Sequence, residues 1–77
     1  MKNKSLKLGK YRHYKGHLYE VLGIANHTET LEPMVVYQAL YDTEEFGPNA
    51  LWVRPLNMFL ETIDIEGVNT QRFEFVK

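Results

Sequence analysis

Three histidines and a nearby glutamate are the residues of this sequence best suited to metal binding or proton transfer. His13, His17 and His27 lie close together in the chain, and Glu29 follows two positions after the last of them. A zinc site needs three or four such ligands at defined spacing. His13 and His17 stand four positions apart, but across a predicted turn and not along a helix. We therefore expect no metal site and no cofactor.

Acid–base catalysis is the second chemistry that these residues suggest. His27, Glu29 and Glu32 share a predicted loop, and loops often display catalytic groups. A general base also needs a positioned partner and a pocket, and the sequence indicates neither. The glycines are too dispersed to form a phosphate-binding loop, and no nucleophile-elbow pattern occurs. We expect a protein that acts by binding, not an enzyme.

The elements that must position these residues are short strands separated by turn-forming residues. Alternating or β-branched runs predict strands at 10–14, 18–26, 34–41, 51–55, 63–67 and 72–76. Lys15 and Gly16 predict a tight hairpin turn, and Pro55 predicts the start of one helical or 3₁₀ turn at 55–60. Segments 27–33 and 42–50 read as loops. This order predicts a mainly β fold, a small SH3-like antiparallel barrel of five or six strands, with an OB-fold as the second choice.

Strand alternation divides the apolar residues between two faces. The simplest register places the following residues in the core: Val36, Leu40, Leu51 and Val53. The other face, which we expect to be partly exposed, then carries Tyr37, Tyr41, Trp52 and Arg54. A slip of one residue would exchange the two faces.

An aromatic and arginine surface on that second face is the candidate binding site. Such surfaces stack on bases, bind proline-rich peptides or hold partner side chains. Trp52 fits either the core or the site, and Arg54 should pair with Glu29 or Glu32 if it does not bind a ligand. We expect the site to join loop and strand residues: His27, Thr28, Glu29, Tyr37, Trp52 and Arg54. The favoured function is recognition of a protein or peptide, and binding of a small molecule at His27, Glu29 and Arg54 is a further alternative.

The charge distribution leaves nucleic acid as a weaker alternative partner. The chain has 77 residues and a net charge of −1, yet its first 17 residues carry six bases and no acid. A basic segment can bind nucleic acid, although the rest of the chain is acidic. The residues that would make this contact are Lys7, Lys10, Arg12 and Lys15. We expect residues 1–8 to form a flexible basic tail and residues 9–77 to form one domain.

Other features narrow the setting of the protein. It has no cysteine and no apolar run that approaches the roughly 20 residues of a membrane span. We expect a cytoplasmic protein without membrane contact, either a monomer or a weak homodimer paired through an exposed edge strand at 63–66.

Several motifs together give the sequence a resemblance to a known family. They are His-x-Lys-Gly at 13–16, Ala-x-His-Thr-Glu-Thr at 25–30, Val-Val-Tyr at 35–37, and Trp-Val-Arg-Pro at 52–55 followed by Met58 and Phe59. From about Gly9 to Val76 the chain resembles the bacterial family catalogued as domain of unknown function 1653. The resemblance implies a small SH3-like barrel but no reaction, substrate or catalytic residue. The segment 42–50 departs from the family pattern because it is longer and more acidic.

Overall fold

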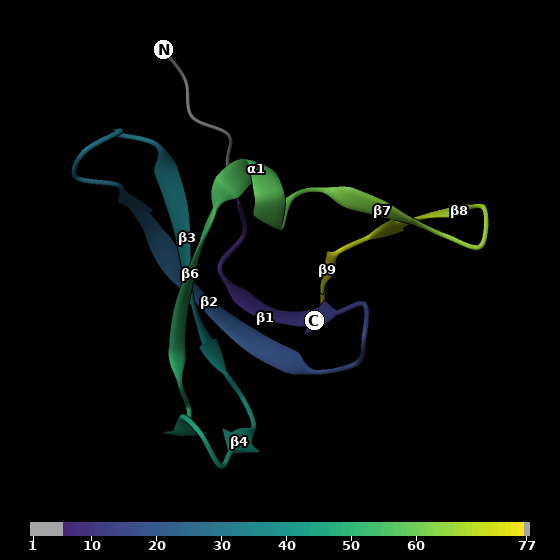
Figure 1. Ribbon diagram of the computed structural model, residues 1–77, viewed down its shortest axis with the longest axis horizontal. Coiled ribbons are helices and arrows are strands. Elements are labelled where there is room, and N and C mark those ends of the chain that lie inside the picture. Colours follow the sequence, from purple (N-terminus) through teal and green to yellow (C-terminus); the bar gives the residue numbers. More distant parts are fainter. Residues whose placement is uncertain (1–5, 77) are drawn as a thin grey trace.

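Five of the strands form one curled antiparallel sheet. The computed structural model describes residues 6–76, and Figure 1 shows the sheet wrapping around a short helix. Its strands lie in the order β6-β3-β2-β1-β9. Their bounds are β1 Gly9–His13, β2 Leu18–Asn26, β3 Pro33–Ala39, β6 Leu51–Pro55 and β9 Phe73–Phe75.

The β1–β2 hairpin turns where Lys15 and Gly16 predict it. The backbone N–H of His13 donates to the carbonyl of His17 at 2.8 Å, and Gly16 N–H donates to His13 at 2.7 Å. Gly16 has a φ of 107°, which a residue with a Cβ rarely adopts. The predicted hairpin is confirmed.

A bulge in β2 explains why that strand carries apolar residues on both faces. Val21 pairs with Tyr37 and Ile24 pairs with Val35, so Leu22 is the extra residue between them. A bulge bends its strand and increases the local twist. The long strand β2 therefore curls the sheet and gives it a concave inner face.

The core lies on this inner face, and the predicted assignment of the faces was wrong. Leu51 and Val53 are 64% and 60% exposed, Leu40 is also exposed, and Val36 is only partly buried. The buried residues are Tyr11, Val21, Val35, Tyr37, Ala39, Leu56, Phe59 and Phe73. Four of these eight side chains carry aromatic rings, and large rings fill the narrow space inside a strongly curled sheet better than aliphatic side chains do.

The helical turn completes the core. Helix α1, Leu56–Phe59, follows Pro55 directly, as predicted, with Pro55 at the N-cap position. Leu56 and Phe59 are buried, and the ring of Phe59 stacks on Phe73 with centroids 4.1 Å apart. This contact connects α1 to the last strand of the sheet.

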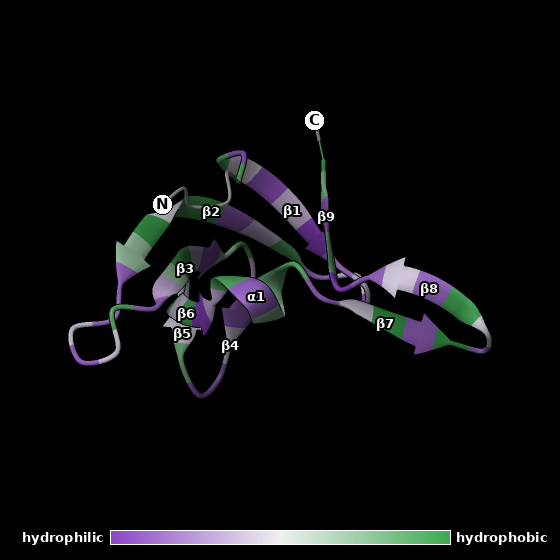
Figure 2. Cartoon of the chain, turned by 90° about the horizontal axis from the view of Figure 1, so that it is seen from above, coloured by the Kyte–Doolittle hydropathy of each residue, from purple (hydrophilic) through white to green (hydrophobic). Residues whose placement is uncertain are grey.

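Two hairpins lie outside the main sheet. In the segment 42–50, predicted as a loop, β4 (Asp42–Thr43) pairs with β5 (Gly47–Pro48). Strand β7 (Thr62–Ile65) pairs with β8 (Val68–Gln71), which the sequence did not predict as a strand. Figure 2 shows this hairpin extending away from the curled sheet. The predicted edge strand at 63–66 therefore has a partner within the chain along one side.

The fold is mainly β and antiparallel, as predicted, but the sheet is open. Within residues 6–76, β6 and β9 form its two edges and do not pair with each other, so no closed barrel is present. The predicted tail lies partly outside the described residues, which begin at Leu6; Leu6 itself packs against the core. No helix of the described chain is long and apolar enough to cross a membrane.

Candidate functional site

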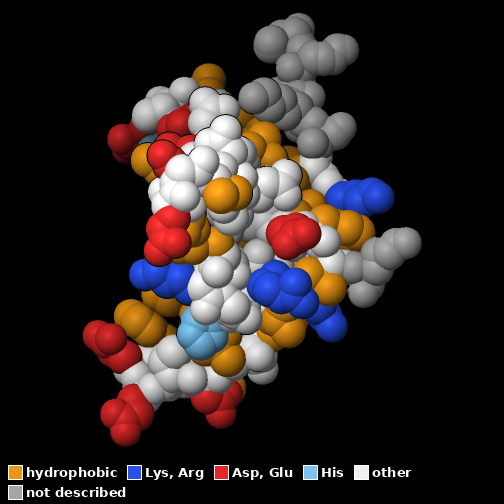
Figure 3. All heavy atoms as spheres, turned by 90° about the vertical axis from the view of Figure 1, so that its right-hand side faces the viewer, with side chains coloured by type: hydrophobic (Ala, Val, Ile, Leu, Met, Phe, Trp, Pro, Cys, Tyr) orange, Lys and Arg blue, Asp and Glu red, His pale blue; other side chains and the backbone are white. Residues whose placement is uncertain are grey.

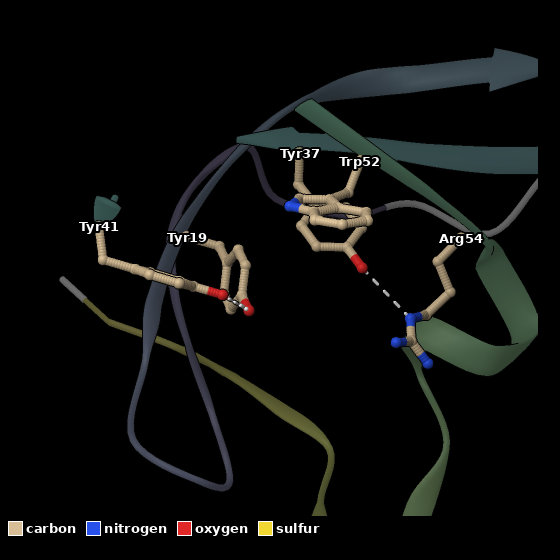
Figure 4. Close-up of a pocket in the computed structure, with 5 residues that line it drawn as sticks. All are labelled: Tyr19, Tyr37, Tyr41, Trp52 and Arg54. Carbon is tan, nitrogen blue, oxygen red and sulfur yellow. Dashed lines mark hydrogen bonds between the residues drawn. The ribbon is translucent and has the colours of Figure 1, made fainter. Parts of the chain in front are cut away.

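A small cavity opens on the inner face of the sheet. Its volume is about 200 Å³, and it is lined by Tyr19, Tyr37, Tyr41, Trp52 and Arg54. Figure 4 shows Tyr19 and Tyr41 at one end, Tyr37 and Trp52 in the middle, and Arg54 at the other end. The side chains come from β2, β3, β6 and the residues after β3. Sequence reasoning grouped four of these five residues on one face.

Cross-strand pairing explains how this group forms. Tyr37 in β3 is the direct partner of Trp52 in β6, and Val35 is the partner of Arg54. Directly opposed residues project to the same face of a sheet. Trp52 and Arg54 therefore lie on the inner face with Tyr37, while Leu51 and Val53 lie on the outer face.

Arg54 is the charged group of the cavity. Its Nε donates a hydrogen bond to the hydroxyl of Tyr37 at 3.3 Å, and its guanidinium carbon lies 5.6 Å from the ring centroid of Phe73. The predicted ion pair with Glu29 or Glu32 is absent, because the ion pair found among residues 6–76 joins Arg72 to Glu61. Within the described chain Arg54 thus has aromatic neighbours but no carboxylate to neutralise it.

Two tyrosines close the opposite end of the cavity. The hydroxyls of Tyr19 and Tyr41 lie 2.6 Å apart in a hydrogen bond, and the imidazole of His17 stacks on Tyr41 at 4.2 Å. Burial, with the hydrogen bond to Tyr41, raises the pKa of the Tyr19 phenol well above its ordinary value. The Tyr19 hydroxyl therefore stays protonated at neutral pH, and its hydrogen bond with Tyr41 gives this end of the cavity a polar wall.

Several cationic side chains lie near His13, close to the cavity. Burial lowers the pKa of His13 below its ordinary value, and the nearby charges of Arg54, Arg72 and Lys15 lower it further. Figure 3 shows basic side chains and a histidine across the middle of one face, with acidic side chains beside them and at the lower tip, so the charges on this face are mixed. Arg54 is the cationic side chain that lines the cavity itself.

The predicted loop residues do not join this cavity. His27, Thr28 and Glu29 are exposed and lie in the turn between β2 and β3. The Nδ1 atom of His27 accepts the backbone N–H groups of Glu29 and Thr30 at 3.1 and 3.3 Å. His27 therefore stabilises its own turn, and the proposed pocket of His27, Glu29 and Arg54 is not formed.

The basic residues proposed for nucleic acid do not form one uninterrupted surface. Lys10 lies opposite Glu20 across the β1–β2 pair, and Arg12 lies opposite Glu74 across the β1–β9 pair. The ammonium groups of Lys7 and Lys15 lie over the rings of Phe75 and Tyr14. Acidic residues thus flank the basic pair on β1 and reduce its attraction for phosphate.

Residues outside the sequence prediction complete the site. Tyr19 was missed, although its alternation with Val21 places it on the inner face. Phe46, from the turn between β4 and β5, contacts Trp52 edge to face at 5.0 Å. No group of three His, Asp or Glu side chains in the described chain is arranged to hold a metal ion.

The fold and the cavity define a small, mainly β domain with an aromatic site and one arginine. The chain belongs to the family described as Protein of unknown function (DUF1653), whose model matches residues 9–75. It is similar to the crystal structure of a protein of this family from Bordetella bronchiseptica, with 38% identity and a TM-score of 0.82. That similarity covers 92% of this chain and 87% of the other. Among curated proteins none matches the chain.

Proposed function

We propose that this domain is a binding module that recognises a short segment of a partner protein. One ring-bearing side chain of the segment contacts the aromatic walls of the cavity, and a carboxylate of the segment pairs with Arg54. The observation that carries this proposal is an arginine that has no carboxylate partner among residues 6–76 and lies at the end of a cavity walled by four aromatic residues.

The size of the cavity favours a side chain over a larger ligand. A cavity of about 150 Å³ can hold benzene, whereas pockets for small molecules and cofactors usually measure about 300–1,000 Å³. The volume of about 200 Å³ therefore fits one ring and is too small for a nucleotide. Tyrosine and tryptophan walls stack on such a ring with little loss of side-chain entropy.

The chemistry of Arg54 explains why an acidic segment is expected. A guanidinium presents five N–H donors, and within the described part of the chain Arg54 uses only Nε, which donates to the hydroxyl of Tyr37. The two terminal nitrogens can therefore donate hydrogen bonds to the two oxygens of a carboxylate in a bidentate pair. The bond to Tyr37 and the ring of Phe73 hold the guanidinium in place before a ligand arrives, which lowers the entropy cost of binding.

The same proposal has three further parts. The domain acts by binding and not by catalysis, it works in the cytoplasm, and its curled sheet is SH3-like. An SH3-like barrel opened between β6 and β9 would present its aromatic residues on the concave side, as observed here. The five residues that line the cavity offer aromatic and cationic groups, which suit binding of a ligand.

Selection from a phage-displayed library of random 12-residue peptides tests the proposal. We expect peptides that carry an aromatic residue close to an Asp or Glu, and we expect binding to quench or shift the fluorescence of Trp52, the one tryptophan in the chain. Arg54→Gln should lower the affinity for the selected peptides by about tenfold or more, as expected for the loss of a charged hydrogen-bonded pair. Arg12→Gln, on the outer face of β1, is the matched control and should leave binding unchanged.

A defined pair of probes separates the two parts of the site. N-acetyl-phenylalanine has both ring and carboxylate, and its amide has the ring alone. NMR shifts at the cavity residues should be larger for the acid than for the amide, and Arg54→Gln should remove the difference. If no peptide is selected, or if Arg54→Gln and Arg12→Gln bind equally well, the proposal is wrong. Salt-sensitive binding of a dT12 oligonucleotide instead would favour the nucleic-acid alternative.

A further inference from the structure

An unpaired sheet edge runs beside the cavity. Strand β6 is the outermost strand of the five-stranded sheet, and within residues 6–76 it pairs only with β3. It also supplies Trp52 and Arg54 to the cavity. The strand that presents the two recognition side chains is therefore the strand with a free edge.

The register shows which backbone groups of β6 are free. Ala39 N–H donates to the carbonyl of Ala50 at 2.8 Å, so these two residues begin the hydrogen-bonded series between β3 and β6. Bonded and non-bonded pairs alternate in an antiparallel ladder. Trp52 and Arg54 then direct their N–H and C=O groups toward β3. Leu51 and Val53 direct theirs outward, away from the sheet.

We propose that the partner segment binds as an added antiparallel strand along β6, with its backbone bonded to Leu51 and Val53. This inference rests on the proposed function, because it describes how the segment recognised by the cavity is held. Addition of a strand to a sheet edge is a common way to bind extended peptides, with affinity from the backbone and specificity from alternate side chains.

The geometry of such a strand gives a spacing rule for the ligand. In the antiparallel arrangement, one residue of the segment pairs with Val53 through backbone hydrogen bonds, and the residue two positions later pairs in the same way with Leu51. The residue between them lies opposite Trp52, and the residue before them lies opposite Arg54. Directly opposed side chains share a face and approach to about 5 Å. The segment therefore reads, from its N-terminus, as an acid opposite Arg54, one spacer residue, and an aromatic residue opposite Trp52.

Charge complementarity favours a peptide over a second copy of this chain. If two copies paired through β6 about Trp52, each Arg54 would lie opposite Ala50 of the other copy, because those positions are symmetric about residue 52. Arg54 would then remain without a carboxylate. Pro55 lacks an N–H and Asn49 has a φ of 58°, so the usable edge is confined to about the length of β6.

Backbone methylation of a selected peptide tests this mode of binding directly. Each N–H of the tightest peptide from the library is replaced in turn by N–CH₃, and the affinity is measured by Trp52 fluorescence. We expect losses of about tenfold or more at the spacer residue and at the residue after the aromatic, because each replacement removes a bond to β6. Methylation at the acid and at the aromatic residue should be tolerated. Uniform tolerance along a peptide that still requires Arg54 would overturn strand addition and leave the proposed function standing.

Substitution of Val53 gives an independent test from the side of the protein. Val53→Pro removes an outward N–H and no bond to β3, so it should weaken the peptide by tenfold or more while the domain stays folded. Val53→Ala keeps the N–H and should bind normally. If Val53→Pro binds as well as Val53→Ala, strand addition is wrong; if Val53→Pro fails to fold, the methylation series decides. Sedimentation equilibrium of the free chain adds a further outcome, since a dimer abolished by Val53→Pro would assign the edge to a second copy and overturn the proposal.

Discussion

Val35 and Val53 are the same residue on adjacent strands, and their replacement by alanine tests which face of the sheet is the core. Val35 is 0% exposed and Val53 is 60% exposed. Each substitution removes the same two methyl groups, from a buried position in one variant and from an exposed position in the other. The difference between the two variants therefore reports chiefly the burial of the side chain.

The expected magnitudes differ clearly. About 0.8 kcal/mol is lost for each buried methyl group, and the remaining cavity adds to this, so Val35→Ala should reduce the free energy of unfolding by about 2–3 kcal/mol. Val53→Ala should change it by about 0.5 kcal/mol or less. In a domain of this size each 1 kcal/mol lowers Tm by about 4–8 °C.

Urea unfolding followed by circular dichroism measures both variants against the parent chain. Equal losses, or a larger loss for Val53→Ala, would mean that Leu51 and Val53 face the core after all. That result would also move Trp52 and Arg54 to the outer face, away from Tyr37. The stability experiment thus tests the geometry on which the binding site depends.

Three further predictions follow from the ionisable groups. Burial and the bond to Tyr41 raise the pKa of Tyr19 in the folded protein. The contribution of Tyr19 to the free energy of unfolding is therefore complete below about pH 10 and is lost as the pH rises further. Tyr19→Phe should flatten this decline of stability at alkaline pH, measured by urea unfolding. Burial and neighbouring cations lower the pKa of His13, so the free energy of unfolding should fall as the pH drops below about 6.5. Arg54→Gln removes one of these cations and should raise the pKa of His13, measured by NMR titration. An unchanged titration curve would contradict the placement of Arg54 near His13. Glu61→Gln removes the carboxylate that lies 3.1 Å from the guanidinium of Arg72. The free energy of unfolding should fall by less than about 1 kcal/mol in low salt and by less still in high salt. A larger loss that does not depend on salt would count against a surface ion pair.

Local signals in the sequence predicted the elements well. Gly16 marks the first hairpin because glycine adopts backbone angles that other residues avoid. Pro55 marks the start of α1 because proline fixes its own φ. The pairing of β7 with β8 was missed, since Val68–Gln71 contains only one apolar residue. A strand that is stabilised by its hairpin partner and not by the core leaves no alternating pattern to detect.

The faces of the sheet were harder to predict than its strands. Alternation places Trp52 and Arg54 on one face of their strand, and the simplest register adds Tyr37 to that face. It does not tell whether their face or the face of Leu51 and Val53 is buried, because both carry apolar residues. The bulge at Leu22 and the ring stacking of Phe59 on Phe73 select the aromatic face, and both depend on contacts between distant parts of the chain.

The shared use of one face for the core and for the site has a consequence for this small domain. Tyr37 has its ring in the core and its hydroxyl on Arg54, so its complete removal would affect folding and binding at once. Arg54 and Trp52 lie at the margin, where a change reaches the cavity with less effect on packing. A chain of 77 residues has little surface to spare for a separate binding platform, and an aromatic core that extends to the free edge of β6 supplies one without additional elements. On the proposed mode of binding, the open sheet has a function, because closure of β6 against β9 would cover the edge that the proposed ligand strand requires.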